Sequence, residues 1–314
     1  MKRMAAVVTA LALILSLCSC SPAKKTYKVD LIIKSVDSDF WKSVYEGALA
    51  AGGKYNLDIN FMGPKEEKDY RQQVGYLEQA IRNRPDAIVL AAGDYNGMSG
   101  PMERAVASGI PVILIDSSVS SRKWVASIST DNYNAGKTLA QEMVRRLPQY
   151  TKIGVIGFVK NASPGIEREK GFVEYIKNSS TLKIVDTVYC DSNFDIAQGQ
   201  TEQMLRDHPE ITALAGLNAQ SATGAARALD ALKNDKVFLG GIDCTVEEAD
   251  YMDRGILSVA VLQNPYMMGY YSMETVSKVL NKKPYERNFY TEVCVVDKNN
   301  MFSKQNEQLI FPFE

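Results

Sequence analysis

The chain has 314 residues, of which 46% are hydrophobic and 23% charged, and its formal net charge is −1. A chain of this length exceeds one ordinary hydrophobic core, so two units of normal size are expected. The balanced charge excludes the basic surface that nucleic-acid binding requires and the composition of an acidic tail.

The first residues are typical of an export signal. A positively charged start precedes an uncharged apolar run, residues 4–17, which is too short to cross a bilayer as a helix. The run ends in LCSC, residues 17–20, which resembles a bacterial lipoprotein signal, where cleavage before the last cysteine leaves its thiol to carry lipid. We therefore expect a signal peptide over 1–19, a linker over 20–26 that is lipid-anchored at Cys20, and a place on the extracytoplasmic face of the cell membrane.

From residue 27 onward, short β-branched runs alternate with longer amphipathic stretches, which is the pattern of βαβ units. Along the first half, the pattern predicts a strand over 28–34, a helix over 40–54, a strand over 57–62, a helix over 66–83, a strand over 87–92, a further helix, and a strand over 112–115. Apolar residues recur at helical spacing in each predicted helix.

The same alternation restarts after residue 130. It predicts helices over 132–147 and 167–178, and strands over 153–159, 184–190, 213–217, 237–242 and 259–262. The fold class expected is α/β, with two similar doubly wound parallel-sheet lobes. No Gly/Ser-rich or Pro-rich linker separates the halves, which indicates short connections that act as a hinge.

Polar side chains follow several of the predicted strands. They are Asp94, Asp116, Asn218, Asp243 and Gln263. Each alone could be a helix N-cap or a turn former, but together they exceed what capping needs. Because ligands bind beyond the carboxyl ends of strands in open α/β sheets, we expect these groups to line a site. Carboxylates and amides, with an arginine such as Arg168, hold sugar hydroxyls in fixed geometry.

Three aromatic residues stand at strand-to-helix junctions: Phe40, Trp41 and Phe194. Aromatic rings pack well on the C–H faces of sugars, so these residues are further candidates for ligand contact. For Trp41, core packing on its own helix is an equal alternative, because Trp41 shares a helix face with Val44 and Ala48.

Cysteines and acidic residues give little indication of a metal site. After loss of Cys18 and acylation of Cys20, three cysteines remain: Cys190, Cys244 and Cys294. Because their number is odd, they cannot form a complete disulfide framework. Because none of them has C-x-x-C spacing, no zinc site is predicted. The spacing of Asp191, Asn193, Asp195 and Glu202 fits a calcium loop except that Ile196 stands where glycine is needed, so calcium binding stays a minor alternative.

Six stretches occur in order along the chain: KSVDSDFW (34–41), GIPVILID (109–116), TDN (130–132), EREKGF (167–172), GGID (240–243) and QNP (263–265). Together they resemble the type I periplasmic binding proteins that recognise sugars, closest to the ribose-binding kind, over nearly the whole mature chain. The resemblance implies hinges near Ser129-Thr130, Gln263 and Thr291. The expected lobes are therefore 27–130 plus 264–291 and 131–263 plus 292–314.

The resemblance also implies roles for individual residues. Phe40, Trp41 and Phe194 would sandwich the sugar ring, Asp116, Arg168, Asn218, Asp243 and Gln263 would bind hydroxyls, and Ser38 and Lys34 are further candidates. The family's ribose site has an asparagine at Ser38 and an arginine at Ser117, so two ribose contacts are missing. Lys34 either replaces one of them or is an exposed lysine at a strand end.

The function implied is an extracytoplasmic lipoprotein that captures a monosaccharide, or a similar small polyhydroxylated ligand, between its lobes and delivers it to the permease of an ABC importer. Ligand would favour the closed form. The alternative is a sensor that presents a bound sugar or furanose-like signal to a chemoreceptor or histidine kinase. We expect a monomer that needs no cofactor.

An enzyme is the rival class, because acidic residues in a cleft can do acid–base work. The single histidine, His208, lies in a helix-ending turn, and the sequence has no nucleophile elbow and no Rossmann glycine fingerprint. A carboxylate-based glycosidase stays as an alternative, since two acidic groups suffice for that chemistry. We expect a binding protein and not an enzyme.

Overall fold

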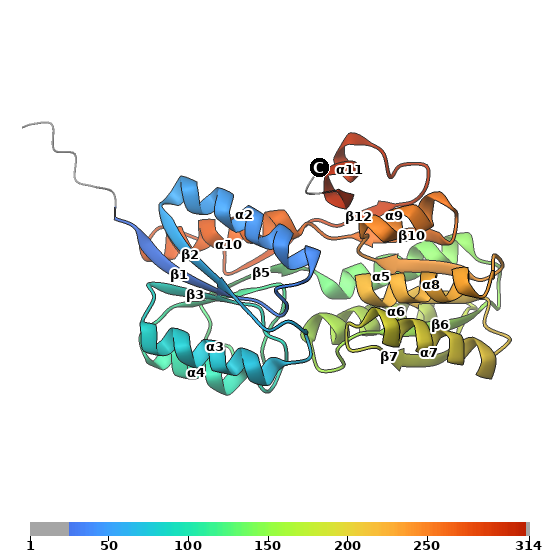
Figure 1. The fold of residues 1–314 in the computed structure, drawn as a ribbon, viewed down its shortest axis with the longest axis horizontal. Coiled ribbons are helices and arrows are strands. Elements are labelled where there is room, and N and C mark those ends of the chain that lie inside the picture. Colours follow the sequence, from blue (N-terminus) through green and yellow to red (C-terminus); the bar gives the residue numbers. More distant parts are fainter. Residues whose placement is uncertain (1–24, 312–314) are drawn as a thin grey trace, which may run out of the picture.

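Two six-stranded sheets organise residues 25–311, the part of the chain that the computed structural model describes (Figure 1). Sheet A has the strand order β11-β5-β4-β3-β1-β2, and sheet B has the order β12-β10-β9-β8-β6-β7. The two orders correspond strand by strand, except that the edge strand β11 is parallel to its neighbour whereas β12 is antiparallel. The predicted signal peptide and Cys20 lie outside the described residues.

The N-terminal lobe consists of sheet A and the helices packed on it. Its elements are β1 (Tyr27–Ile32), α2 (Asp39–Tyr55), β2 (Leu57–Met62), α3 (Tyr70–Asn83), β3 (Ala87–Leu90), α4 (Ser99–Ala107), β4 (Val112–Ile115) and β5 (Ala126–Thr130), completed by α10 (Pro265–Leu280) and β11 (Asn288–Thr291). Fully apolar strands such as β3 and β4 are buried because helices cover both faces of a parallel sheet. One hydrophobic cluster joins the sheet to α2 and α10, and another joins it to α3 and α4.

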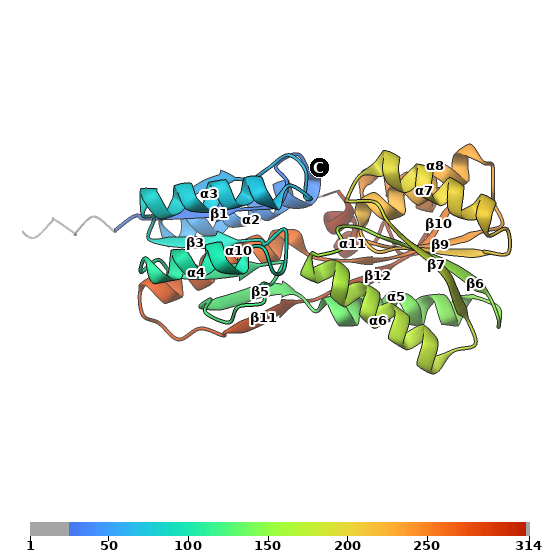
Figure 2. The ribbon, with the colours of Figure 1, turned by 90° about the horizontal axis from the view of Figure 1, so that it is seen from below.

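The C-terminal lobe consists of sheet B and its helices. Its elements are α5 (Asn132–Arg146), β6 (Lys152–Gly157), α6 (Ser163–Ser179), β7 (Lys183–Tyr189), α7 (Phe194–Asp207), β8 (Ala213–Gly216), α8 (Ala219–Ala231), β9 (Phe238–Ile242), α9 (Val246–Asp253), β10 (Leu257–Leu262), β12 (Cys294–Val296) and α11 (Lys304–Ile310). In Figure 2, α7 and α8 lie on one side of this sheet, and α5 and α6 on the other. The predicted fold class, two doubly wound α/β lobes, is confirmed.

Two helices begin elsewhere than predicted. The helix expected from residue 66 starts at Tyr70, because the residues before it form a turn in which the Asp69 N–H donates to the Glu66 carbonyl at 3.1 Å. The helix expected from Glu167 already starts at Ser163, with proline in its first turn, where its fixed φ is favourable. The earlier start places Arg168 in the second turn of the helix instead of the first.

The chain passes between the lobes three times, through the short connections from β5 to α5, from β10 to α10 and from β11 to β12. A hydrogen bond of 2.7 Å from Thr130 Oγ1 to Gln263 Oε1 joins the first two connections. The expectation of short connections rather than a flexible tether is confirmed.

Reciprocal glycines bring helices α5 and α6 into backbone contact. A Cβ on Gly136 would lie 2.0 Å from the carbonyl oxygen of Arg168, and a Cβ on Gly171 would lie 2.0 Å from that of Tyr133. No other residue fits such an approach without moving a helix. In the N-terminal lobe, α2 and α10 meet in the same reciprocal way. The contact fixes the backbone of Arg168 against the helix that follows the first connection.

Candidate functional site

A cavity of about 220 Å³ lies between the lobes and is lined by residues from both. Its volume is below the roughly 300–1,000 Å³ of typical ligand pockets, so it suits only a small molecule. The predicted site residues that line it are Lys34, Ser38, Phe40, Trp41 and Asp116 from the N-terminal lobe, and Arg168, Phe194, Asn218, Asp243 and Gln263 from the C-terminal side. The structure therefore brings these sequence-predicted residues together.

Asp94 is the exception among the predicted residues, because it does not line the cavity. Its Oδ1 accepts hydrogen bonds from the backbone N–H groups of Asn96 at 3.0 Å and Gly97 at 2.6 Å. Asp94 thus stabilises the turn that leads into α4, as short acidic side chains commonly do. The ligand role predicted for Asp94 is corrected to that of a turn former.

Asp116 and Asp243 occupy equivalent places in the two sheets. Asp116 follows β4 and its N–H donates to Ile128 of β5 at 2.8 Å, while Asp243 follows β9 and its N–H donates to Val261 of β10 at 2.9 Å. Both residues have left-handed backbone conformations, with φ of 61° and 75°. Such a conformation is uncommon outside glycine and costs free energy, and it is typical of functional sites. Each lobe thus turns one carboxylate into the cavity from the same position of its sheet.

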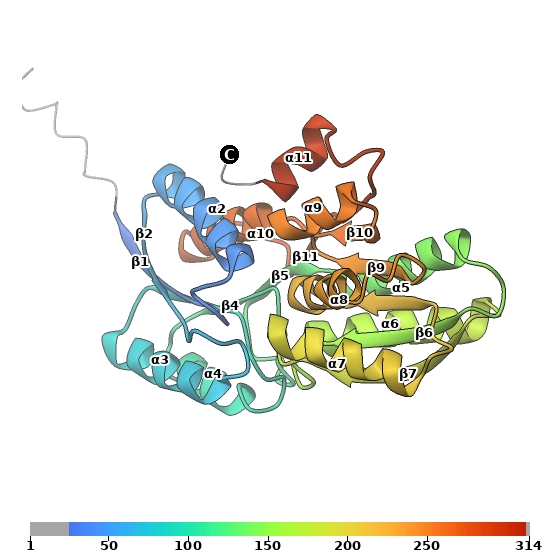
Figure 3. The same cartoon turned by 45° about the vertical axis from the view of Figure 1, so that its right-hand side comes forward.

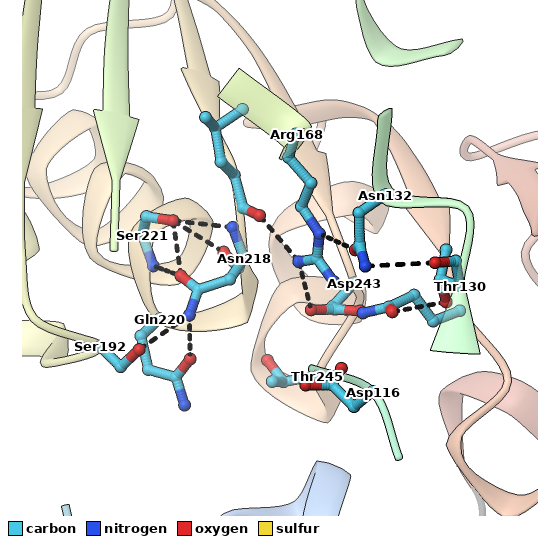
Figure 4. Close-up of polar contacts among 12 residues, drawn as sticks. Asp116, Thr130, Asn132, Arg168, Ser192, Asn218, Gln220, Ser221, Asp243 and Thr245 are labelled. Carbon is cyan, nitrogen blue, oxygen red and sulfur yellow. Dashed lines mark hydrogen bonds and ion pairs between the residues drawn. The ribbon is translucent and has the colours of Figure 1, made fainter. Parts of the chain in front are cut away.

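Arg168 is held on three sides by hydrogen bonds and one ion pair (Figure 4). Its Nε donates to Asn132 Oδ1 at 2.8 Å, and its Nη1 donates to the Leu217 carbonyl at 2.9 Å and lies 3.8 Å from Asp243 Oδ2. The other oxygen of Asp243 accepts from Gln263 Nε2 at 2.7 Å. Burial raises the pKa of the Asp243 carboxyl above its ordinary value, although Arg168 and Gln263 partly oppose that shift. These contacts hold the guanidinium in one orientation.

Lys34 is buried, with 4% of its side chain exposed, and its Nζ lies 2.9 Å from Asp116 Oδ2. Ser117 Oγ donates to the same oxygen at 2.5 Å. Burial lowers the pKa of Lys34, but the nearby carboxylates of Asp116 and Glu67 raise it more, so the ammonium group stays charged at physiological pH. The alternative of an exposed strand-end lysine is wrong.

Aromatic rings from both lobes contribute to the cavity walls. Trp41 packs in the core with no exposed surface and also lines the cavity, so core packing is confirmed, and ligand contact by Trp41 stays a prediction. The rings of Phe40 and Trp41 meet edge to face, with centroids 5.1 Å apart. Phe194 comes from the C-terminal lobe. Phe158, which the sequence analysis missed, also lines the cavity, and its ring lies 5.5 Å from the Arg168 guanidinium.

Further lining residues were also missed by the sequence analysis, among them Glu67, Gln220, Thr245, Leu309 and Ile310. Glu67 lies in the loop after β2, so the strand-end rule that selected Asp116 could have found it. Nothing in the sequence indicated Leu309 and Ile310, because α11 reaches the cavity only through tertiary packing.

The lobes touch each other across the cleft, beside the cavity. Ser192 Oγ donates to Glu67 Oε2 at 2.8 Å, and Asn218 Nδ2 donates to Ser192 Oγ at 3.2 Å. The Ser118 N–H donates to Ser163 Oγ at 2.7 Å. Because the Ser192–Glu67 and Ser118–Ser163 bonds join the two lobes, the structure has the lobes closed over the cavity.

Within the described part of the chain, no group of three or more His, Cys, Asp or Glu residues is placed to hold a metal ion. His208 lies near Asp186 and Glu210 and is not part of the cavity wall. The three thiols between residues 25 and 311 are unpaired, and only Cys244 lines the cavity. No helix in this range is long and apolar enough to span a bilayer.

Comparison with known proteins gives consistent matches. A family model described as the periplasmic binding protein domain matches residues 29–284. The ribose import binding protein RbsB of Bacillus subtilis is 26% identical over 300 residues, which cover 91% of this chain and 96% of the relative. A solved ABC transporter solute-binding protein of Agrobacterium vitis with bound D-fucose is 33% identical, with a TM-score of 0.87 and coverage of 90% of this chain and 99% of that chain. A chain in a structure of the XylFII-LytSN complex is 26% identical, with a TM-score of 0.83 and coverage of 88% and 99%.

Proposed function

We propose, since the chain belongs to the family of periplasmic binding proteins, that it is an extracytoplasmic protein that captures a monosaccharide or a similar small polyhydroxylated ligand between its lobes. The observation that carries the proposal is the closed cavity in which the predicted carboxylates, amides, arginine and aromatic rings meet. Such groups match what a sugar offers, since hydroxyls both donate and accept hydrogen bonds and C–H faces pack on rings.

The charges of the cavity favour a neutral ligand. Its two lining cations, Lys34 and Arg168, each already face a carboxylate, Asp116 and Asp243 respectively. An anionic ligand would meet these carboxylates without finding an unpaired cation. A hydroxyl group, in contrast, can donate to a carboxylate and accept from its cationic partner at once.

The ligand we propose is not restricted to ribose. Where the ribose site of the family has an arginine after the aspartate, this chain has Ser117, and the cation beside Asp116 comes instead from Lys34, which follows β1. The B. subtilis relative is named for ribose and the A. vitis structure holds D-fucose, so pentoses and hexoses both belong in a ligand screen.

The first test is thermal melting of the chain that starts after Cys20, with and without each member of a monosaccharide panel. A ligand that binds only the folded state at 100 times its Kd raises the melting temperature of a chain of this size by roughly 4–5 °C. One or a few sugars are expected to give such a shift. Absence of a shift with every sugar would contradict the proposal, and consumption of an oligosaccharide in parallel incubations would support the glycosidase alternative.

We further propose that the protein is a lipid-anchored monomer that hands its sugar to the permease of an ABC importer. Removal of the Cys20 thiol, by Cys20→Ser, is expected to move the protein from the membrane to the soluble fraction, because a lipid cannot then be attached. Fractionation of cells, together with uptake of the labelled sugar in a strain that lacks the protein, checks both parts. Membrane retention of Cys20→Ser would contradict the anchor.

A sensor role is the second candidate, and one observation favours it: a similar chain forms the XylFII-LytSN complex. In the uptake experiment, the importer can be expressed from a constitutive promoter, so that its amount does not depend on sensing. If the protein is a sensor, the strain that lacks it should then still take up the sugar at the full rate. If the protein is instead the binding subunit of the importer, the same strain should take up no sugar.

A further inference from the structure

The C-terminal helix α11 forms part of the cavity wall. Leu309 and Ile310, its last residues, line the cavity, although they lie far along the chain from every other lining residue. In Figure 3, α11 lies above α9. The helix thus reaches the ligand space from outside the two sheets.

Packing and hydrogen bonds hold α11 in place. Ile310 is 2% exposed and belongs to the core of the C-terminal lobe together with Leu262 and Met301. Asn306, buried in the same helix, donates from Nδ2 to the Asn300 carbonyl at 3.0 Å. The helix is therefore packed on the core of this lobe through Ile310.

Other apolar groups line the cavity from the segments that lie beneath α11. They are Leu262 and Pro265, which flank the second connection between the lobes, and Cys244 and Val246 at the start of α9. Burial raises the pKa of the Cys244 thiol well above its ordinary value, so this thiol is neutral and behaves as a small apolar group. We call Cys244, Val246, Leu262, Pro265, Leu309 and Ile310 the apolar wall.

The apolar wall contrasts with the polar groups shown in Figure 4. Asp116, Arg168, Asn218 and Asp243 offer charged and amide atoms to hydroxyls, whereas the side chains of the apolar wall offer neither strong donors nor strong acceptors. A sugar hydroxyl pressed against this wall would lose its bonds to water without replacement, while a methyl group there would gain from burial.

We propose that α11 creates an apolar subsite and that the ligand is a monosaccharide with an apolar group at that edge, as in a 6-deoxyhexose. The inference rests on the proposed capture of a sugar and names its class. The C-terminal segment is then a specificity-determining part of the protein.

The test compares sugars that differ only at C6. Calorimetric titration of the chain that starts after Cys20 would use three pairs: D-fucose with D-galactose, L-fucose with L-galactose, and L-rhamnose with L-mannose. For at least one pair, the 6-deoxy member is expected to bind about 10- to 100-fold more tightly, the usual discrimination of an apolar pocket. Equal or tighter binding of the hydroxylated member in every pair that binds would overturn the inference.

A substitution in α11 tests whether the apolar wall causes the preference for the 6-deoxy sugar. Leu309→Asn should bring the ratio of the two affinities close to 1, whereas the matched control Leu309→Met, which keeps the volume and the apolar character, should preserve it. Val246→Asn repeats the test at a position that is 57% exposed, where folding does not depend on the side chain. A preference that survives both asparagine variants would overturn the role of the wall.

These experiments distinguish a failure of sugar capture from a failure of the apolar subsite alone. If no sugar of these pairs or of the monosaccharide panel bound, sugar capture itself would be wrong, and the subsite with it. If a sugar bound but the pairs gave no preference, sugar capture would stand and only the subsite would be wrong.

Discussion

Replacement of Arg168 by alanine is expected to abolish sugar binding and to leave the chain folded. The guanidinium is 2% exposed and is fixed by Asn132 and the Leu217 carbonyl beside Asp243, so no other group can take its place. Loss of one partner of a buried, hydrogen-bonded charge pair typically costs about 2–5 kcal/mol of binding, which is roughly 30-fold to several thousand-fold in Kd. Titration calorimetry with the sugar of the panel that binds most tightly measures this change in Kd.

The fold should survive because Asp243, left without its cation, can take up a proton. Burial already raises the pKa of that carboxyl, so protonation is less costly than for an exposed aspartate. Asp243→Ala should likewise abolish binding. Arg206→Ala is a suitable control, since Arg206 is an exposed arginine on α7 that should affect neither property. Unchanged affinity in the Arg168 or the Asp243 variant would contradict the site assignment.

Lys34→Met is expected to destabilise the sugar-free chain by about 3–5 kcal/mol, because it leaves Asp116 buried without its cation. The double variant Lys34→Met/Asp116→Asn should recover most of that loss, since asparagine is neutral and tolerates the left-handed backbone of this position. Both variants should bind sugar poorly. Urea denaturation without ligand gives the two free energies of unfolding.

The control for Lys34 is Lys42→Met. Lys42 also lies 2.8 Å from an aspartate, Asp39, but both side chains are more than half exposed, and such pairs contribute little, typically less than about 1 kcal/mol. The pKa of Lys34 is raised above its ordinary value of 10.5, so the contribution of its ion pair is fully present below that pH and is lost only at more alkaline pH. Measurement near neutral pH therefore captures it in full. Equal effects of the two substitutions would contradict a special role for the buried pair.

The strand-end rule explains why much of the site could be predicted from the sequence. Parallel strands end at one edge of a sheet, so polar residues such as Asp116, Asn218 and Asp243 had to converge once the strands were recognised. The rule failed at Asp94 for a local reason, since the N–H groups of Asn96 and Gly97 bind its carboxylate. Whether a side chain faces its own turn or the cavity depends on backbone conformation, which the residue type does not reveal.

Other parts of the site depend on contacts between distant segments. Lys34 is buried because Asp116, which follows a different strand, lies 2.9 Å away, and neither residue alone indicates that pair. The approach of Leu309 to the cavity needs the whole C-terminal segment to fold back over the second lobe. Periodicity can predict a helix, but it cannot predict on which part of the molecule a short terminal helix will pack.

The packing of α10 on α2 in the N-terminal lobe affects the order in which the two lobes can fold. The first lobe needs α10 and β11, residues 265–291, to cover α2 and to complete its sheet, whereas the parallel strands of the second sheet come from one continuous segment, 152–262. A newly made chain emerges from its N-terminus, and continuous domains can fold as they emerge. The half that is synthesised first therefore cannot complete its fold until residues 265–291 have been made. Until residues 265–280 are available to form α10, the apolar face of α2 has no native partner, so the first-made half stays incompletely packed during most of synthesis.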